Sequence, residues 1–387
     1  MIKVGSDFSG VGAFNQALIR LGIDYKEVFA CDMDKYARQT FVHNYGEPEY
    51  YPTNVYDRDI PSEPLDIYMT SPPCQAFSLA GKRLGKEDKR GILFFNSHEF
   101  IKVNKPRYFI FENVKGLLSD DNGNTFNEWV NLLGGKSVNG MPIMFPYEDS
   151  VPYHIYWNVL NAKEHGVPQN RERVFIVGIR DDFDNKFRFP IEERLIKKLK
   201  DVLEDDVDDK YYLSENAINN IIKSKFNQDF KDNNTDYVGC IIAGYGKIPS
   251  DGNYIKVKSA TSKGYEEASN SLTTVQKDNV LVFNNKRINE TLEKHELQDG
   301  EVTLIDSYNK SIHKETSPTI STRVNASSCT HLWDGYEIRR LTPRECFRLM
   351  DFPDTFTWPV SDSQAYKQAG NSIVVNVLYK IIKNLNL

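Results

Sequence analysis

Short apolar runs alternate with segments of helical period through the first 180 residues of the chain. Residues 2–4 predict a strand, and the apolar side chains of Phe14, Ala17, Leu18 and Leu21 then recur at the spacing of one helix face. The pattern returns, with further strands predicted at 28–31, 65–70, 108–111, 154–160 and 174–179 and helices at 34–45 and 94–103. Such alternation predicts an α/β fold, a doubly wound, mostly parallel sheet with helices on both faces.

The alternation of strand-like and helix-like segments ends after about residue 180, which predicts a second domain. The charged segment 191–200 reads as a helix and the acidic run 201–209 as a solvated linker, and Asn-, Ser- and Gly-rich sequence follows with short β-like runs at 239–246 and 279–283. Residues 376–385 read as a closing helix. We expect this second domain to be smaller, irregular and β-rich, and to begin near residue 189.

The composition indicates a globular protein of the cytoplasm without a membrane partner, since no apolar run approaches the ~18 residues of a membrane span. The net charge of -6 argues mildly against strong nucleic-acid binding, but much of the acid lies in 201–209. The cysteines are odd in number, widely spaced and without a C-x-x-C pair, so we expect free thiols and no metal site; they are Cys31, Cys74, Cys240, Cys329 and Cys346.

Polar residues follow the predicted strands at the ends where open α/β sheets bind ligands. The first strand leads into Asp-Phe-Ser-Gly-Val-Gly at 7–12, whose glycines let the backbone approach a ligand closely. Asp32 follows the second strand, about 20 residues past Gly12, a separation at which an acid reaches the ribose of a nucleoside cofactor. Cys74 and Glu112 follow two later strands. One crevice would then hold a nucleoside pocket, a thiol and a carboxylic acid.

Each of these features also has a plainer interpretation. A single G-x-G is a weak signal, Asp32 could cap a helix, an isolated cysteine is most often a small buried apolar residue, and Glu112 could be a surface carboxylate. Their joint appearance at successive strand ends favours a functional site. The absence of a third glycine counts against a dinucleotide and favours a cofactor with a ribose but no pyrophosphate.

Seven segments then carry a family resemblance: DFSGVGAF, CDMD, SPPCQAFS, FENV, QNRERVF, RRLTPRECFRLMDFPD and GNSIVVNV. In these segments and their order the chain resembles, over nearly its whole length, the DNA (cytosine-5) methyltransferases of the bacterial or phage, restriction-modification-like type. The resemblance implies the S-adenosylmethionine-dependent methyltransferase fold. It implies one domain from 1–188 plus 365–387, which binds the cofactor and carries catalysis, a target-recognition domain inserted at 189–342, and a hinge at 343–364. It also implies S-adenosylmethionine as cofactor, S-adenosylhomocysteine as product, and no metal.

The resemblance assigns the catalytic roles to four residues. Cys74 would attack carbon 6 of a flipped-out cytosine, and Glu112 would hydrogen-bond or protonate the base at N3 and contact its amino group. Arg173 would hold the base O2, and Arg171 would support the loop that carries the cysteine.

The resemblance also assigns the cofactor contacts. Phe8 would stack on the adenine, Asp32 would bind the ribose, and the full predicted set is Phe8, Gly10, Gly12, Asp32, Met33, Asn54, Pro73, Leu93 and Asn371. Two of these depart from the family pattern, because Asn54 stands where an acid is usual and Met33 where an aromatic is usual. An amide oxygen can still accept a hydrogen bond, and a methionine can still cover the adenine.

Double-stranded DNA is the expected partner, with the target-recognition domain approaching the major groove. The Gly- and Lys-rich segment after Ser78 reads either as a solvated loop or, by resemblance, as a loop that closes over the flipped base. The predicted DNA contacts are Gln75, Ser78, Lys82, Arg83, Arg323 and Asn325. We expect a functional monomer that protects DNA from a cognate restriction endonuclease, with a phage-borne or solitary enzyme as the alternative.

Three rival functions remain open from the sequence. A methyltransferase of the same chemistry could act on RNA, although a recognition region of ~150 residues suits sequence-specific DNA readout better. A binding-only homologue would not need an intact Cys74 and Glu112. A nicotinamide dehydrogenase would explain the G-x-G segment but not the cysteine or the second domain.

Overall fold

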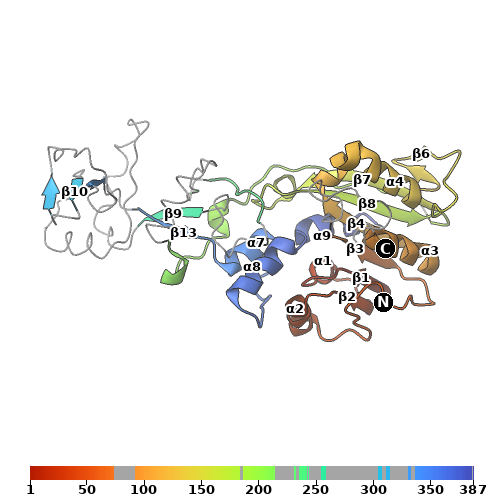
Figure 1. The fold of residues 1–387 in the computed structure, drawn as a ribbon, viewed down its shortest axis with the longest axis horizontal. Coiled ribbons are helices and arrows are strands. Elements are labelled where there is room, and N and C mark those ends of the chain that lie inside the picture. Colours follow the sequence, from red (N-terminus) through yellow and green to blue (C-terminus); the bar gives the residue numbers. More distant parts are fainter. Residues whose placement is uncertain are drawn as a thin grey trace. The chain divides into compact units, whose positions relative to one another are not determined.

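A computed structural model describes residues 1–73, 92–183, 186–213, 231, 235–241, 243, 254–258, 304–306, 311–313, 330–332, 336–385 and 387. The chain divides into two compact units (Figure 1). The first unit consists of Met1–Val202, Asp236–Gly246 and Pro343–Leu387, and the second of Leu203–Thr235 and Lys247–Thr342.

The first unit is built on a sheet that has eight strands in the described part of the chain. Its parallel half has the order β2-β1-β3-β4 and consists of β1 (Ile2–Asp7), β2 (Tyr25–Cys31), β3 (Ile67–Thr70) and β4 (Tyr108–Val114). The other half continues with β8 (Glu172–Arg180), β7 (Tyr153–Asn161), β5 (Ser137–Val138) and β6 (Met141–Pro142). β8 runs antiparallel to both β4 and β7, so the sheet is mixed, and its parallel half carries the strand ends that the sequence singled out.

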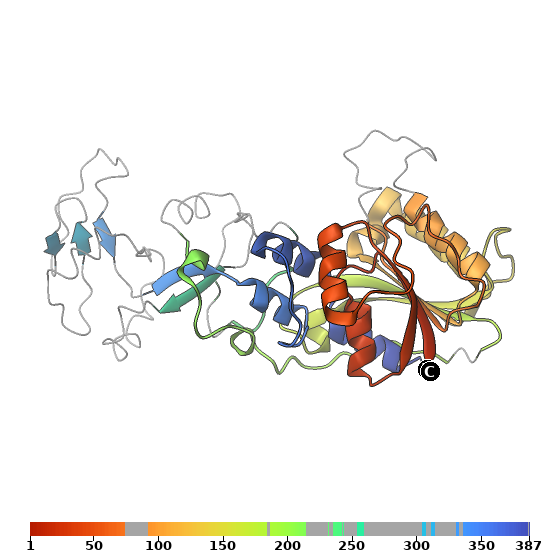
Figure 2. The same ribbon diagram turned by 90° about the horizontal axis from the view of Figure 1, so that it is seen from below.

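Helices cover both faces of this sheet. Figure 2 shows α1 (Ala13–Arg20) and α2 (Lys35–Tyr45), in red, on one side, and α3 (Ile92–Asn104) and α4 (Asn124–Leu133), in orange, on the other. Two 3-10 helices, η2 (Lys115–Gly123) and η3 (Ala162–His165), follow β4 and β7. Asp34 starts α2, since its carboxylate accepts hydrogen bonds from the N–H groups of Tyr36 at 2.9 Å and Ala37 at 3.3 Å.

Aromatic side chains fill the core between the sheet and the helices α3 and α4. Tyr68 of β3 stacks on Phe100 of α3 with ring centroids 4.1 Å apart, and Phe94 stacks on Trp129 of α4 at 4.2 Å. Burying one such side chain contributes about 1.5–3 kcal/mol, so this layer holds the parallel strands in place.

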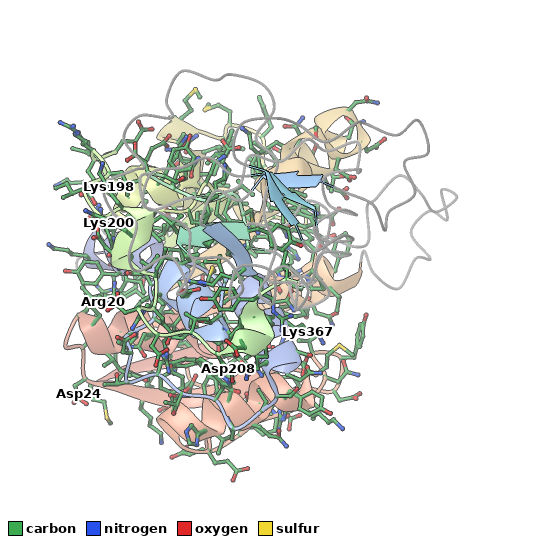
Figure 3. All side chains as sticks on the ribbon, turned by 90° about the vertical axis from the view of Figure 1, so that its left-hand side faces the viewer. Arg20, Asp24, Lys198, Lys200, Asp208 and Lys367 are labelled. Carbon is green, nitrogen blue, oxygen red and sulfur yellow. The ribbon has the colours of Figure 1, made fainter. Side chains whose placement is uncertain are left out.

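The C-terminal segment packs on the helices that follow β1 and β2. It contains α7 (Pro343–Leu349), α8 (Asp362–Asn371) and α9 (Val375–Lys383), and α9 confirms the predicted closing helix. Arg20 and Lys367, labelled in Figure 3, belong to these contacts: Arg20 donates to the Asp351 carbonyl at 2.6 Å, and Lys367 Nζ lies 2.6 Å from Asp34 Oδ2. Residues 367–373 thereby reach the strand ends.

The prediction of a helix at 191–200 is wrong. Residues 190–196 contain neither helix nor strand, and only the short 3-10 helix η4 (Leu199–Asp201) forms. A ten-residue helix is marginal without tertiary packing, and Ile191 and Ile196 have no apolar face to pack on, being 89% and 86% exposed. The backbone N–H of Glu193 instead donates to the Glu164 carbonyl at 2.8 Å.

The predicted strand at 239–246 is likewise not formed in its described residues. The chain is held there by Val238, whose N–H donates to the Pro168 carbonyl at 3.1 Å and whose carbonyl accepts from Asn170 at 2.8 Å. The strand predicted at 279–283 lies outside the described residues. In the acidic run, the aspartates are exposed as expected, whereas Val202 is buried.

The second unit is β-rich where it is described. β9 (Tyr254–Lys258) pairs antiparallel with β13 (Tyr336–Arg340), and a short 3-10 helix, η5, spans Asp209–Tyr211. β10 (Leu304–Asp306) pairs antiparallel with both β11 (Ser311–His313) and β12 (Thr330–Leu332). Within the described residues of the chain, no helix is long and apolar enough to span a membrane, and no group of three metal-ligating side chains gathers.

Candidate active site

The ends of the parallel strands open into a cavity of about 1240 Å³ within the first unit. All of the predicted cofactor residues except Gly12 line it: Phe8, Gly10, Asp32, Met33, Asn54, Pro73, Leu93 and Asn371. Glu112, Arg171 and Arg173 line the same cavity. The structure therefore brings together residues from eight separate segments of the sequence in one cavity at the edge of the sheet.

The loop between β1 and α1 has an unusual backbone. Phe8, Gly10 and Gly12 all have positive φ, at 57°, 55° and 84°. A Cβ on Gly12 would lie 2.2 Å from Tyr45 Cε2, and the Tyr45 hydroxyl donates to the Gly12 carbonyl at 3.0 Å. Gly12 is therefore required by the packing of α1 against α2, whereas Gly10 faces the cavity.

Asp32 fastens this loop to the end of β2. Its two carboxylate oxygens accept the backbone N–H groups of Gly10 and Asp34, each at 2.8 Å. Desolvation raises the pKa of Asp32, and the same two hydrogen bonds oppose that rise. Asp34, not Asp32, caps α2, so the helix-cap interpretation of Asp32 does not hold.

Residues 53–56, which precede β3, form another wall of the cavity. Asn54 is exposed, and its amide oxygen accepts the Tyr56 N–H at 3.1 Å while its amide nitrogen faces Asp57 at 3.4 Å. Met33 is 86% exposed beside it on the cavity. The amide oxygen of Asn54 thus already has one partner and keeps one lone pair for another.

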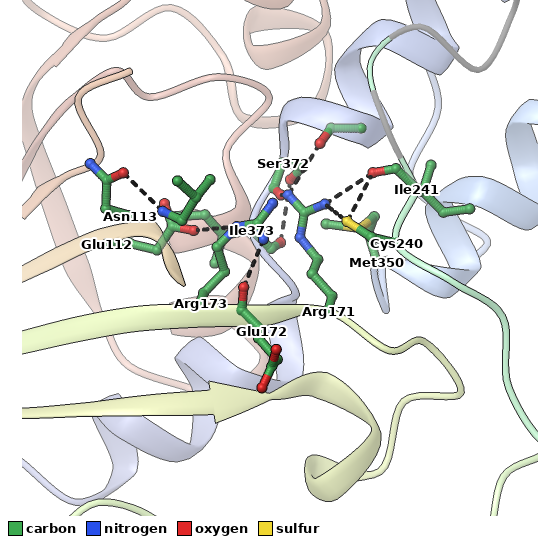
Figure 4. Close-up of polar contacts among 12 residues, drawn as sticks. Glu112, Asn113, Arg171, Glu172, Arg173, Cys240, Ile241, Met350, Ser372 and Ile373 are labelled. Atoms are coloured by element: carbon green, nitrogen blue, oxygen red, sulfur yellow. Dashed lines mark hydrogen bonds and ion pairs between the residues drawn. The ribbon is translucent and has the colours of Figure 1, made fainter. Parts of the chain in front are cut away.

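Glu112 and Arg173 form an ion pair on the cavity wall (Figure 4). In the antiparallel pairing of β4 with β8, Arg173 stands opposite Val114, which makes it the diagonal neighbour of Glu112. Arg173 Nε lies 3.1 Å from Glu112 Oε1. Burial raises the pKa of Glu112 above its usual value, and the guanidinium groups of Arg173 and Arg171 oppose that rise.

Arg171 is buried and joins three segments of the chain (Figure 4). Its guanidinium donates to the carbonyls of Ser372 at 2.8 Å, Ile241 at 3.0 Å and Gly370 at 3.1 Å, and to Cys240 Sγ at 3.1 Å. These described partners belong to the chain around 240 and to the end of α8. Contacts with the Cys74 loop fall outside the described residues.

Asn113 fixes the start of the segment that leads to the predicted nucleophile. Its amide nitrogen donates to the carbonyl of buried Pro72 at 3.0 Å, and its amide oxygen accepts the N–H of Val114 at 2.8 Å. Pro72 precedes Cys74 by two residues. Predicted residues that lie outside the described part of the chain are Cys74, Gln75, Ser78, Lys82, Arg83, Arg323 and Asn325.

Sequence reasoning missed several residues of this cavity. Lys367 and Gln368 line it from α8, and Gln368 accepts the Thr40 hydroxyl at 3.0 Å. Asn113 was passed over although it stands next to Glu112. Its place directly at a predicted strand end was the one signal that could have found it; Lys367 and Gln368 carry no local signal.

The comparison with known families decides the assignment. The profile of the family described as C-5 cytosine-specific DNA methylase matches residues 2–386. The chain belongs to this family. It is thus a DNA (cytosine-5) methyltransferase, as the sequence predicted.

Two methyltransferases are similar to this methylase over most of their length. The chain is 33% identical to the orphan methyltransferase M.SPRI of Bacillus phage SPR, with 99% of this chain and 97% of that protein covered. It is also 33% identical to the type II methyltransferase M.HpaII of Haemophilus parainfluenzae, with 95% of this chain and 84% of that protein covered.

Solved structures with low sequence identity share the fold of this methylase. The S. pombe Dnmt2 methyltransferase has a TM-score of 0.65 at 19% identity, with 100% of both chains covered. A putative DNA modification methyltransferase encoded within an E. coli prophage has a TM-score of 0.55 at 20% identity, with 100% of this chain and 98% of that chain covered. The predicted doubly wound methyltransferase fold is confirmed.

Proposed function

We propose that this methyltransferase transfers a methyl group to carbon 5 of a flipped cytosine in a specific sequence of double-stranded DNA, through a covalent bond between Cys74 and carbon 6. The observation that carries the proposal is the ion pair between buried Glu112 and partly buried Arg173, on the wall of the cavity that Phe8 and Asp32 also line. Such an arrangement supports a base and a nucleoside cofactor bound next to each other.

S-adenosylmethionine is the expected methyl donor for this family, and the residues of the cavity fit it. The Asp32 carboxylate can accept hydrogen bonds from ribose hydroxyls, and Phe8 offers an aromatic ring beside it. Gly10 leaves the loop open, since an added Cβ there would have no neighbour nearer than the Phe8 carbonyl, at 4.0 Å. When bound, the cofactor supplies a methyl group on a positively charged sulfonium.

Carbon 5 of cytosine is a weak nucleophile because the aromatic ring holds its electrons. The Cys74 thiolate adds to carbon 6, and the electron pair of the 5,6 double bond then becomes available at carbon 5 for the methyl group. Afterwards water takes the proton from carbon 5, the bond between Cys74 and carbon 6 breaks, and the double bond is restored.

The two ionic residues stabilise the charge that this addition pushes into the ring. Glu112, whose pKa burial raises, donates a proton or hydrogen bond to N3 of the base. Arg173 contacts the base O2, and Glu112 holds its guanidinium in place from β4. Asn113 holds the Pro72 carbonyl by a hydrogen bond and so fixes the start of the segment that carries Cys74. Arg171 supports the cavity wall through its hydrogen bond to the Gly370 carbonyl.

The target carbon is inaccessible inside a duplex, so the base must be extruded at a cost of a few kcal/mol. The proposed DNA contacts are Gln75, Ser78, Lys82 and Arg83 after the nucleophile, with Arg323 and Asn325 in the target-recognition domain, taken as 189–342. In this proposal the enzyme acts as a monomer in the cytoplasm and protects DNA from a cognate restriction endonuclease. Relatives named as type II enzymes support that role, and the orphan phage relative favours a solitary enzyme.

The test is transfer of tritiated methyl groups from S-adenosylmethionine to duplex DNA and to transfer RNA. We expect label in DNA only, at carbon 5 of one cytosine within one sequence, and none with Cys74→Ser. Label in transfer RNA only would show that the substrate is RNA and would refute the proposed DNA substrate. Methylated DNA that resists one restriction enzyme from the same source would support the protective role, and absence of such an enzyme would favour a solitary one.

A further inference from the structure

Asp7, which lines the cofactor cavity, forms a buried ion pair with Arg58. Arg58 Nε lies 2.8 Å from Asp7 Oδ1, and the two side chains are only 2% and 0% exposed. The second carboxylate oxygen of Asp7 accepts the Tyr68 hydroxyl at 2.6 Å. Neither charged residue takes part in the chemistry proposed above.

The surroundings of this pair are aromatic. The Arg58 guanidinium lies 4.5 Å from the ring centroid of Phe100 and 5.6 Å from that of Phe29. Its Nη1 is buried without a hydrogen-bond partner among the described residues. Removing two charges from water is costly, and apolar residues of similar shape are often at least as stabilising as a buried ion pair. Stability alone is therefore a poor explanation for charges at these two positions.

Each of the two partners is close in sequence to a different segment of the cavity lining. Asp7 ends β1 and directly precedes Phe8, whose φ is 57°. Arg58 lies two residues after the wall formed by residues 53–56. That wall belongs to segment 46–66, which contains neither helix nor strand. Backbone hydrogen bonds from Ala30 to the Tyr50 carbonyl at 3.1 Å and from Asp32 to the Pro52 carbonyl at 3.4 Å hold the chain before the wall, and Arg58 holds the chain after it.

We propose that the Asp7–Arg58 pair is a positioning element of the cofactor cavity, which sets the separation between Phe8 and the 53–56 wall for the nucleoside part of the cofactor. The inference rests on the proposed function, since it takes this cavity to bind S-adenosylmethionine. A hydrogen-bonded ion pair fixes the distance between the two backbone segments that carry it, whereas apolar side chains at the same positions could pack in several ways.

The decisive variant removes both charges and keeps the shape, Asp7→Asn with Arg58→Met. The amide introduced by Asp7→Asn carries no charge but still accepts the Tyr68 hydroxyl, so we expect Tm to stay within about 5 °C of wild type. By titration calorimetry, Kd for S-adenosylmethionine and for adenosine should both rise about tenfold or more. The KM for the cofactor should rise equally, with kcat changed less than about threefold.

A matched control neutralises an exposed pair, Lys102→Met with Asp149→Asn, whose charged atoms are 3.0 Å apart on the surface. Its cofactor Kd should equal that of wild type. A double variant of Asp7 and Arg58 with wild-type Tm and wild-type Kd would overturn the inference. If that variant does not fold, Arg58→Lys decides, because it keeps the charge but loses the planar geometry: weakened adenosine binding supports the positioning role, and unchanged binding refutes it. Failure of the wild-type protein to bind S-adenosylmethionine would instead refute the proposed function.

Discussion

Arg173 Nε lies 3.1 Å from Glu112 Oε1 and so joins the start of β8 to the end of β4 on the cavity wall. The pair places a buried acid beside a cation at the site where a base would bind. Glu112→Gln keeps the size of the side chain but cannot supply a proton of similar acidity. We expect kcat to fall by about 10² to 10⁴, with the Kd for S-adenosylmethionine unchanged within about twofold.

Steady-state methylation kinetics and cofactor titration check this prediction. Glu172→Gln is the matched control, because Glu172 adjoins Arg173 but its side chain is 43% exposed and pairs with Lys115. A kcat for Glu112→Gln equal to that of the control would contradict the assigned role.

Asp32→Asn should weaken cofactor binding. The carboxylate accepts one backbone N–H on each oxygen, and an amide must turn its NH₂ group toward one of those donors. We expect the Kd for S-adenosylmethionine to rise about tenfold, since hydrogen bonds to charged groups contribute roughly 1.5–3 kcal/mol. Calorimetry on this variant and on the exposed control Asp24→Asn measures the difference, and equal affinities would show that Asp32 does not serve the cofactor.

Arg171→Met should destabilise the first unit. It leaves the carbonyls of Ile241, Gly370 and Ser372 buried without their donor. The free energy of unfolding should fall by about 3 kcal/mol, because each unsatisfied buried group costs about 1–3 kcal/mol. Urea unfolding compares it with Arg180→Met, whose partners, the Asp182 carboxylate and the Lys105 carbonyl, are both exposed. A loss of stability no larger than in that control would contradict the structural role of Arg171.

Glu27 should make stability depend on pH. Burial raises its pKa to about 7 from an ordinary value of 4.5, while Asn15 donates to it at 2.7 Å. Because the folded state has the higher pKa, the stabilising contribution is complete below about pH 4.5 and is lost as the pH rises through 7.

Glu27→Gln cannot ionise, so it should gain on the order of 1 to 3 kcal/mol relative to wild type between pH 4.5 and pH 8. Urea unfolding at both pH values gives this difference. The control Glu49→Gln, from an exposed pair with Lys26, should show no such change. A difference between Glu27→Gln and wild type that does not vary with pH would contradict the account.

The strand ends of the parallel half could be predicted because their signals are local. The run before Asp32 and the run before Glu112 are short, apolar and followed at once by acids, and parallel strands place those ends at one edge. The mixed half of the sheet was not predictable in this way, because strand direction depends on the connection and not on composition. The helix predicted at 191–200 is not formed for a related reason. A helical period in the sequence does not by itself provide a surface for the helix to pack against.

The long-range contacts of the site had no local signal. Arg171 donates to the carbonyls of Gly370 and Ser372, which are 199 and 201 residues away in the sequence. Lys367 pairs with Asp34, which is 333 residues away. The pairing of Asp7 with Arg58 likewise has no local signal: Asp7 stands at a predicted strand end, but nothing in the sequence around Arg58 indicates that the two residues meet. Tertiary packing determines which residues form these hydrogen bonds and ion pairs, so only a structure can show them.

The central claim is the covalent bond between Cys74 and carbon 6 of cytosine. The most direct test incubates the protein with S-adenosylmethionine and duplex DNA that contains 5-fluorocytosine at the target position. Fluorine cannot leave carbon 5 as a proton does, so the intermediate should accumulate as a denaturation-resistant protein–DNA adduct. We predict this adduct with wild type and none with Cys74→Ser; methyl transfer to DNA without any adduct, or an adduct that survives in Cys74→Ser, would contradict the mechanism.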